Sequence, residues 1–146
     1  APPANPDLMT AAQVEQYVDA LELYQAQNQL QLSDDQLVRA FGARLQRLQM
    51  LKRQQQRQRR ASIVELNQML TGGGPGGIDE AAVAAKVKAL DDLVADFDRR
   101  IQEATAAIDQ TLTPRQRARF RVFEEQMERR KLDLLTRVRQ QPRPTP

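Results

Sequence analysis

The sequence predicts an all-α protein with four helices, built on a long antiparallel helical hairpin with flanking helices. Apolar residues recur at spacings of three and four through most of the chain. The one strong internal breaker is the stretch 71–77, which holds five of the six glycines. We expect an extended Pro-rich leader over 1–9, a single helical domain over 10–140 and a disordered Pro-rich tail over 141–146. The helices are expected near 10–30, 34–70, 79–111 and 114–140.

Each of the first two helices begins at a capping box. Thr10 is the expected N-cap of the first helix, and Gln13 occupies its third position. Ser33 and Gln36 take the same roles in the second helix. In a capping box the two side chains accept hydrogen bonds from backbone N–H groups that have no partner inside the helix. The boxes therefore predict where both helices begin.

The third helix is expected to begin at Asp79 and the fourth at Thr113. Asp79 is a favourable N-cap residue. Thr113 and Gln116 form a third capping box. Pro114 lies at the first helical position, where its missing N–H group costs nothing.

The two middle helices differ in their apolar stripes. The second helix has an apolar stripe that is interrupted in the run 52–60, which contains no apolar residue. If the two helices fold back about the glycines with residue 70 beside residue 79, this basic run faces the four aspartates of the third helix. The arginines of the run then either pair with these aspartates or form an exposed surface. The third helix carries an unbroken seam of Val83, Val87, Leu90, Val94, Phe97, Ile101, Ala104 and Ile108. The four facing aspartates are Asp91, Asp92, Asp96 and Asp98.

Composition excludes several classes of function. The chain has no Cys and no His, so disulfides, Cys/His zinc sites, thiol nucleophiles and His-based catalysis are excluded. Neighbouring carboxylates such as Asp34 and Asp35 point to different faces of a helix, and we expect no enzyme activity and no cofactor. A net charge of +3 and 4% aromatic residues argue against nucleic-acid binding. No apolar run reaches the roughly 20 residues of a transmembrane helix.

Two of the capping boxes belong to a longer pattern, Leu-(Ser/Thr)-x-x-Gln, whose two copies lie 80 residues apart. The residues that match it are Leu32, Ser33, Gln36, Leu112, Thr113 and Gln116. The pattern resembles the LTxxQ motif of the Spy/CpxP family of periplasmic helical proteins. The resemblance covers about residues 30–138 and implies a cradle-shaped homodimer in which the motif residues are structural caps. It also implies binding of unfolding clients or sensor partners without ATP during envelope stress. The zinc-associated, ZraP-like members use ligands that this chain lacks, so metal sensing is not expected.

The resemblance leads to one expected function and one alternative. An N-terminus at Ala1 fits a periplasmic protein whose signal peptide has been removed. The alternative is a dedicated structural, assembly or regulatory subunit that docks on an envelope protein complex. The role of the extra segment 10–30 is open. The candidates for client contact, which could equally form a solvated face, are Arg44, Arg47, Arg53, Arg57 and Arg60.

Overall fold

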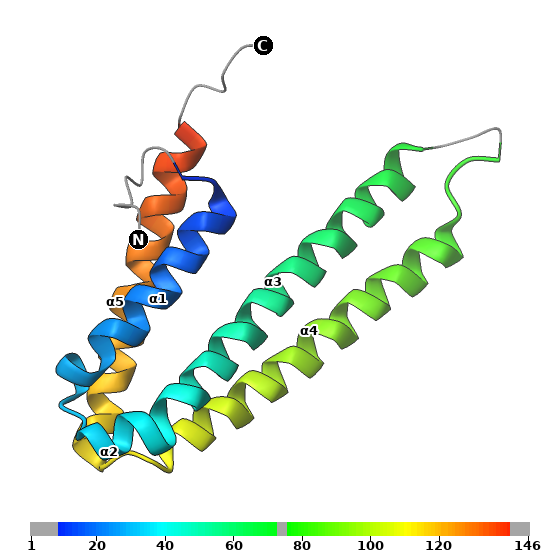
Figure 1. The fold of residues 1–146 in the computed structure, drawn as a ribbon. Coiled ribbons are helices and arrows are strands. Elements are labelled where there is room, and N and C mark those ends of the chain that lie inside the picture. Colours follow the sequence, from blue (N-terminus) through cyan, green and yellow to red (C-terminus); the bar gives the residue numbers. More distant parts are fainter. Residues whose placement is uncertain (1–8, 73–75, 141–146) are drawn as a thin grey trace. The chain divides into compact units, whose positions relative to one another are not determined.

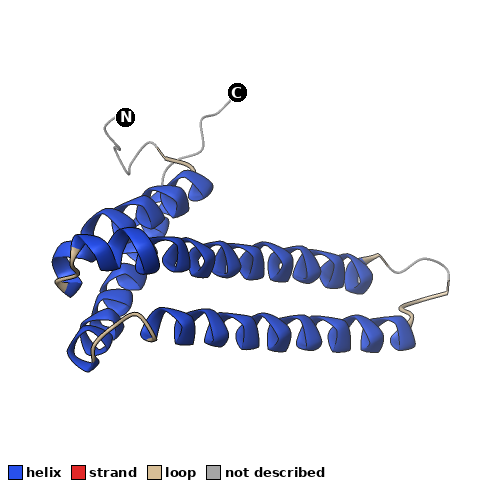
Figure 2. Cartoon of the chain, turned by 60° about the horizontal axis from the view of Figure 1, so that its bottom comes forward, coloured by secondary structure: helices blue, strands red, loops and turns tan. Residues whose placement is uncertain are grey.

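The computed structural model describes residues 9–72 and 76–140, and among these residues the regular secondary structure is helical, with no strand. The prediction of an all-α fold is confirmed. The predicted tail and residues 1–8 of the predicted leader lie outside the described residues. The elements are α1 (Ala11–Leu30), α2 (Asp34–Gln36), the π-helical segment η2 (Leu37–Phe41), α3 (Gly42–Thr71), α4 (Glu80–Asp109) and α5 (Pro114–Gln140), as Figures 1 and 2 show. Because α2, η2 and α3 follow one another without a break, the described residues form the four predicted helices.

The chain forms two compact units, and each is described by itself. The first contains Ala1–Ala43 and Asp109–Pro146, and the second contains Arg44–Ile108. The chain therefore passes from one unit to the other within α3 and returns at the end of α4.

In the first unit, α1 packs against α5 (Figure 1). The rings of Phe41 and Phe120 meet edge to face, with centroids 5.8 Å apart and an interplanar angle of 85°. Both rings are fully buried, and such a pair adds about 0.5–1.5 kcal/mol beyond the burial of its area. The core of this unit also includes Val14, Val18, Leu30, Phe123, Met127 and Leu134, all of which are buried.

A π-helical segment interrupts the second predicted helix, and the sequence pattern did not indicate it. The backbone N–H of Gly42 donates to the carbonyl of Leu37, five residues earlier, which is the hydrogen bond of a π-helix. A Cβ atom at position 42 would lie 3.1 Å from that carbonyl oxygen, closer than ordinary van der Waals contact. Glycine therefore fits this position because the π-turn brings the Leu37 carbonyl against it.

In the second unit, α3 and α4 form the predicted antiparallel hairpin (Figure 2). Lys86 pairs with Glu65, and the amide of Gln55 donates to Asp98 Oδ1 at 2.8 Å. These contacts place the register two and four residues further along α4 than pairing of residue 70 with residue 79 would. Gly77, in the connection, has a φ of 74°, a left-handed conformation that favours glycine.

Candidate functional site

The two copies of the Leu-(Ser/Thr)-x-x-Gln pattern meet in the first unit. At each copy the predicted capping box is formed: the backbone N–H of Ser33 donates to Gln36 Oε1 at 3.0 Å, and that of Thr113 donates to Gln116 Oε1 at 3.0 Å. In return, the hydroxyl of each cap residue accepts the backbone N–H of its own glutamine. The motif leucines, Leu32 and Leu112, are buried beside the boxes.

The two motif glutamines also bind each other. Gln36 Nε2 donates to Gln116 Oε1 at 2.9 Å, and Gln116 Nε2 donates to Gln36 Oε1 at 3.2 Å. Each amide uses its second N–H on a backbone carbonyl, that of Thr111 for Gln36 and that of Gln31 for Gln116. All four amide hydrogens are therefore used, and each side-chain oxygen accepts two hydrogen bonds. We call this arrangement the glutamine junction.

The glutamine junction explains why the pattern requires glutamine at its last position. A glutamate would still accept the backbone N–H of the cap, but it could not donate to the partner side chain or to a carbonyl. The junction contains no nucleophile and no ionisable side chain, so its chemistry is structural. Sequence analysis identified the six motif residues but not the contact between the two copies, because spacing along the chain does not show which helix ends meet.

The candidate arginines of α3 divide into two groups. Arg53, Arg57 and Arg60 are spaced four and three residues apart, so they share one face of the helix, which we call the arginine face. Gln55, two residues from both Arg53 and Arg57, contacts α4. Since two residues span about 200° of helix rotation, the arginine face points away from α4.

Exposed side chains form the arginine face. Arg57 and Arg60 make no hydrogen bond or ion pair within the part of the chain that the structure describes, and the same holds for neighbouring Arg59. Val64 continues the face by four residues and is 50% exposed, and Ile63 beside it is 43% exposed. The surface therefore combines unpaired guanidinium groups with exposed apolar side chains.

Arg44 and Arg47 lie elsewhere. Arg44 is half-buried, and its Nη1 donates to the backbone carbonyl of Ala107 at 2.7 Å, which ties α3 to the end of α4. With Arg100 and Glu103, both arginines line a hollow of about 160 Å³. The structure therefore separates these two candidates from the arginine face.

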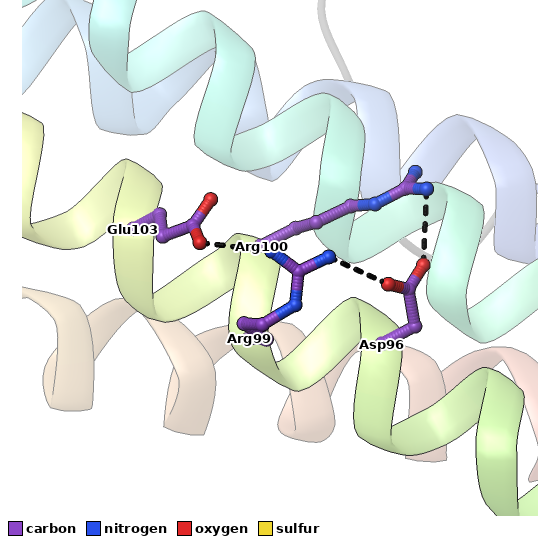
Figure 3. A network of polar contacts seen from close by, with 4 residues as sticks. All are labelled: Asp96, Arg99, Arg100 and Glu103. Atoms are coloured by element: carbon purple, nitrogen blue, oxygen red, sulfur yellow. Dashed lines mark hydrogen bonds and ion pairs between the residues drawn. The ribbon is translucent and has the colours of Figure 1, made fainter.

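Asp96 of α4 pairs with bases of its own helix. It accepts from Arg99 at 2.8 Å and from Arg100 at 3.0 Å, and Arg99 also pairs with Glu103 at 2.9 Å (Figure 3). The hydrogen bond to Asp96 and the charge of Glu103 raise the pKa of Arg99 above its ordinary value. Spacings of three and four residues, which the sequence shows, were the signal for these pairs.

Two more aspartates have partners other than the basic run. Asp92 pairs with Lys88 at 2.8 Å, and the hydrogen bond from that carboxylate raises the pKa of Lys88. Asp98 contacts α3 through the neutral amide of Gln55. Arg57, Arg59 and Arg60 have no such partner among the described residues, so for these three the interpretation as an exposed surface applies.

The apolar seam of α4 is only partly covered. Phe97, Ala104 and Ile108 are buried, whereas Val87 is 42% exposed. Towards the start of α4 the other seam residues, including Val83 and Leu90, are half-buried. This follows from the polar run 52–60 of α3, which supplies no apolar stripe opposite them.

The described residues offer no group of three or more His, Cys, Asp or Glu side chains that could hold a metal ion. Among the same residues, no helix combines the length and the apolar character that membrane spanning requires. Comparisons with protein-family models, with curated proteins and with solved structures found no match to this chain.

Proposed function

We propose that the protein is a non-catalytic, ATP-independent binder of partly unfolded proteins that acts in the periplasm during envelope stress. The observation that carries this proposal is the arginine face, with unpaired Arg57 and Arg60 beside exposed Val64 and Ile63. Unpaired charges attract an oppositely charged chain at long range, and apolar burial then holds it. A partly unfolded protein exposes both acidic and apolar groups, whereas a folded one buries most of its large apolar side chains.

The contrast between the two helices of the hairpin supports this interpretation. On α4, the bases Lys88, Arg99 and Arg100 are each paired with a carboxylate three or four residues away. On α3, residues 37–64 contain eight bases and no acid, so this local pairing is impossible within the run. The charge of the arginine face is therefore available to a partner.

The proposal includes a homodimer. The seam of α4 has the continuous apolar spacing of a helix that packs along its whole length, but α3 covers it incompletely. A second copy that covers Val83, Val87 and Leu90 would remove this apolar surface from water. Location in the periplasm and a role in envelope stress depend on the resemblance of the two motifs to the Spy/CpxP family.

The test is suppression of light scattering while a model client aggregates, without ATP, at about 0.1 M and about 1 M salt. These concentrations change the screening length from about 10 Å to about 3 Å. We expect suppression at the lower salt and clearly weaker suppression at the higher salt. The variant Arg57→Glu with Arg60→Glu should reduce suppression several-fold and leave the far-UV circular dichroism spectrum unchanged.

A matched control is Arg115→Glu with Arg137→Glu, which changes the same charge at exposed positions of α5. This control should retain full suppression. Equal loss in both variants would show that net charge, rather than the arginine face, matters. Absence of suppression at any ratio of protein to client, together with copurification of one partner at fixed stoichiometry, would favour the dedicated subunit of an envelope complex instead.

A further inference from the structure

The first unit has an open hollow of about 790 Å³ at the end of α1, away from the residues of the arginine face. Its lining comes from a short segment in which Tyr24, Asn28 and Gln31 share one helix face. The helix ends at Gln31, whose left-handed backbone (φ 57°, ψ 53°) turns the chain away from the helix axis. Leu32, which follows, is the buried end of the hollow.

The lining is neutral and rich in amides. It contains no Asp, Glu, Lys or Arg side chain. Gln27 and Gln31 are used within the protein, since Gln27 donates to Asp34 and the side-chain oxygen of Gln31 accepts from Arg119. The amides of Gln25, Asn28 and Gln29 have no hydrogen-bond partner among the described residues. The second list of residues, which line the hollow and remain available, is therefore Gln25, Asn28, Gln29 and Tyr24.

These amides define what kind of ligand can bind. Each presents one acceptor oxygen and two donor hydrogens in a plane, and neighbouring hydroxyl groups of a sugar present donors and acceptors at matching separations. A charged ligand would find no counter-charge in the hollow. A purely apolar ligand would leave the amides without water and without partners, which costs free energy.

Tyr24 supplies an aromatic surface in the same place. It is 85% exposed, whereas the four Phe side chains of the protein are buried and Tyr17 is half-buried. An exposed tyrosine ring offers a flat apolar face that the C–H face of a sugar ring can cover, and its hydroxyl group remains free to hydrogen-bond.

We propose that this hollow binds a short segment of a neutral glycan, with one sugar ring stacked on Tyr24 and its hydroxyl groups bound by Gln25, Asn28 and Gln29. The volume lies within the usual range of ligand sites. Because the hollow is open, binding is weak, with a dissociation constant of about 1 mM. The proposal does not depend on client binding, since it uses residues of the first unit only.

The chain allows a direct test, because it contains no Trp and only two Tyr. In a Tyr17→Phe background, Tyr24 is the only tyrosine that emits. We would titrate this variant with chitotetraose, a neutral oligomer of N-acetylglucosamine, up to about 10 mM. The expected result is a saturable change of Tyr24 emission, with no comparable change for an acidic oligogalacturonate of similar length.

Variants then assign the contacts, with binding measured by calorimetry or by saturation-transfer NMR. Tyr24→Ala should weaken binding about tenfold, whereas Tyr24→Phe should retain it because the ring face remains. Asn28→Ala should weaken binding several-fold. Tyr24→Ala should leave the suppression of client aggregation unchanged, which separates this site from the arginine face.

The proposal would be overturned by absence of saturable binding of the neutral oligomer, by equal binding of the acidic one, or by unchanged affinity in Tyr24→Ala. Any of these results would leave the proposed binding of clients on α3 unaffected.

Discussion

Replacement of Gln116 by alanine tests the glutamine junction most directly. The side chain is 8% exposed and makes three hydrogen bonds as donor or acceptor outside its own residue pair with Thr113 Oγ1: to Thr113 N–H, to the Gln31 carbonyl and to Gln36. Alanine removes all three. The Gln31 carbonyl and the Gln36 amide then lose partners in a partly buried place.

The expected cost follows from these losses. The capping contribution is about 1 kcal/mol. A buried polar group left without a partner costs about 1–3 kcal/mol, at the lower end where water can reach it, as at half-buried Gln36. We therefore expect Gln116→Ala to reduce the free energy of unfolding by about 2–4 kcal/mol, measured by urea unfolding followed by circular dichroism at 222 nm.

Gln13 provides a matched control within the same chain. It forms the same capping box with Thr10, but it is exposed and makes no contact with a second motif. Gln13→Ala should cost about 1 kcal/mol or less. The glutamate variants should differ more: Gln13→Glu should be neutral or slightly stabilising in the first turn of α1, whereas Gln116→Glu places a carboxylate against two oxygens and should cost at least as much as alanine. Equal costs at positions 13 and 116 would refute the reasoning, because they would show that the box alone matters.

Three further predictions concern stability. The ion pair with Asp109 raises the pKa of Arg121, so its contribution is complete below the ordinary arginine pKa and is lost only as pH rises through the higher folded value. Because the chain also has no His, thermal midpoints should be nearly constant from about pH 6 to about pH 8, and a midpoint that moves steeply there would contradict this. Gly77→Ala should cost about 1 kcal/mol in urea unfolding, since alanine is strained at a φ of 74°; a stabilised variant would argue against the left-handed turn. Phe120→Ala should cost about 3–5 kcal/mol by the same assay, because it removes a fully buried ring from Phe41, and a cost below about 1 kcal/mol would show that this core is not packed as described.

Local sequence signals predicted most of the fold. Thr10, Ser33 and Thr113 each precede a helix that begins where the capping box places it. Such signals are readable because a cap involves residues only three apart. The π-turn before Gly42 was not predictable in this way, because it depends on how Phe41 is buried against Phe120.

Charge pairing shows the same limit. Opposite charges on α3 and α4 favoured pairing across the hairpin, but Asp96 is closer to Arg99 and Arg100 on its own helix, and a pair four residues apart requires no tertiary register. Long-range complementarity in a sequence therefore has to be weighed against partners within one turn before it is assigned to a tertiary contact.

The same comparison explains why α3 carries the candidate surface for partner binding. An arginine with a carboxylate three or four residues away can be neutralised by its own helix, as Arg99 is by Glu103. Arg57 and Arg60 have no acid within four residues on either side. Their charge can be balanced only by another part of the chain, by a second molecule or by solvent ions, and among the described residues no partner balances it. A run of bases without acids on a long helix thus leaves charge for a second molecule, and the neighbouring exposed Val64 gives that molecule an apolar contact as well.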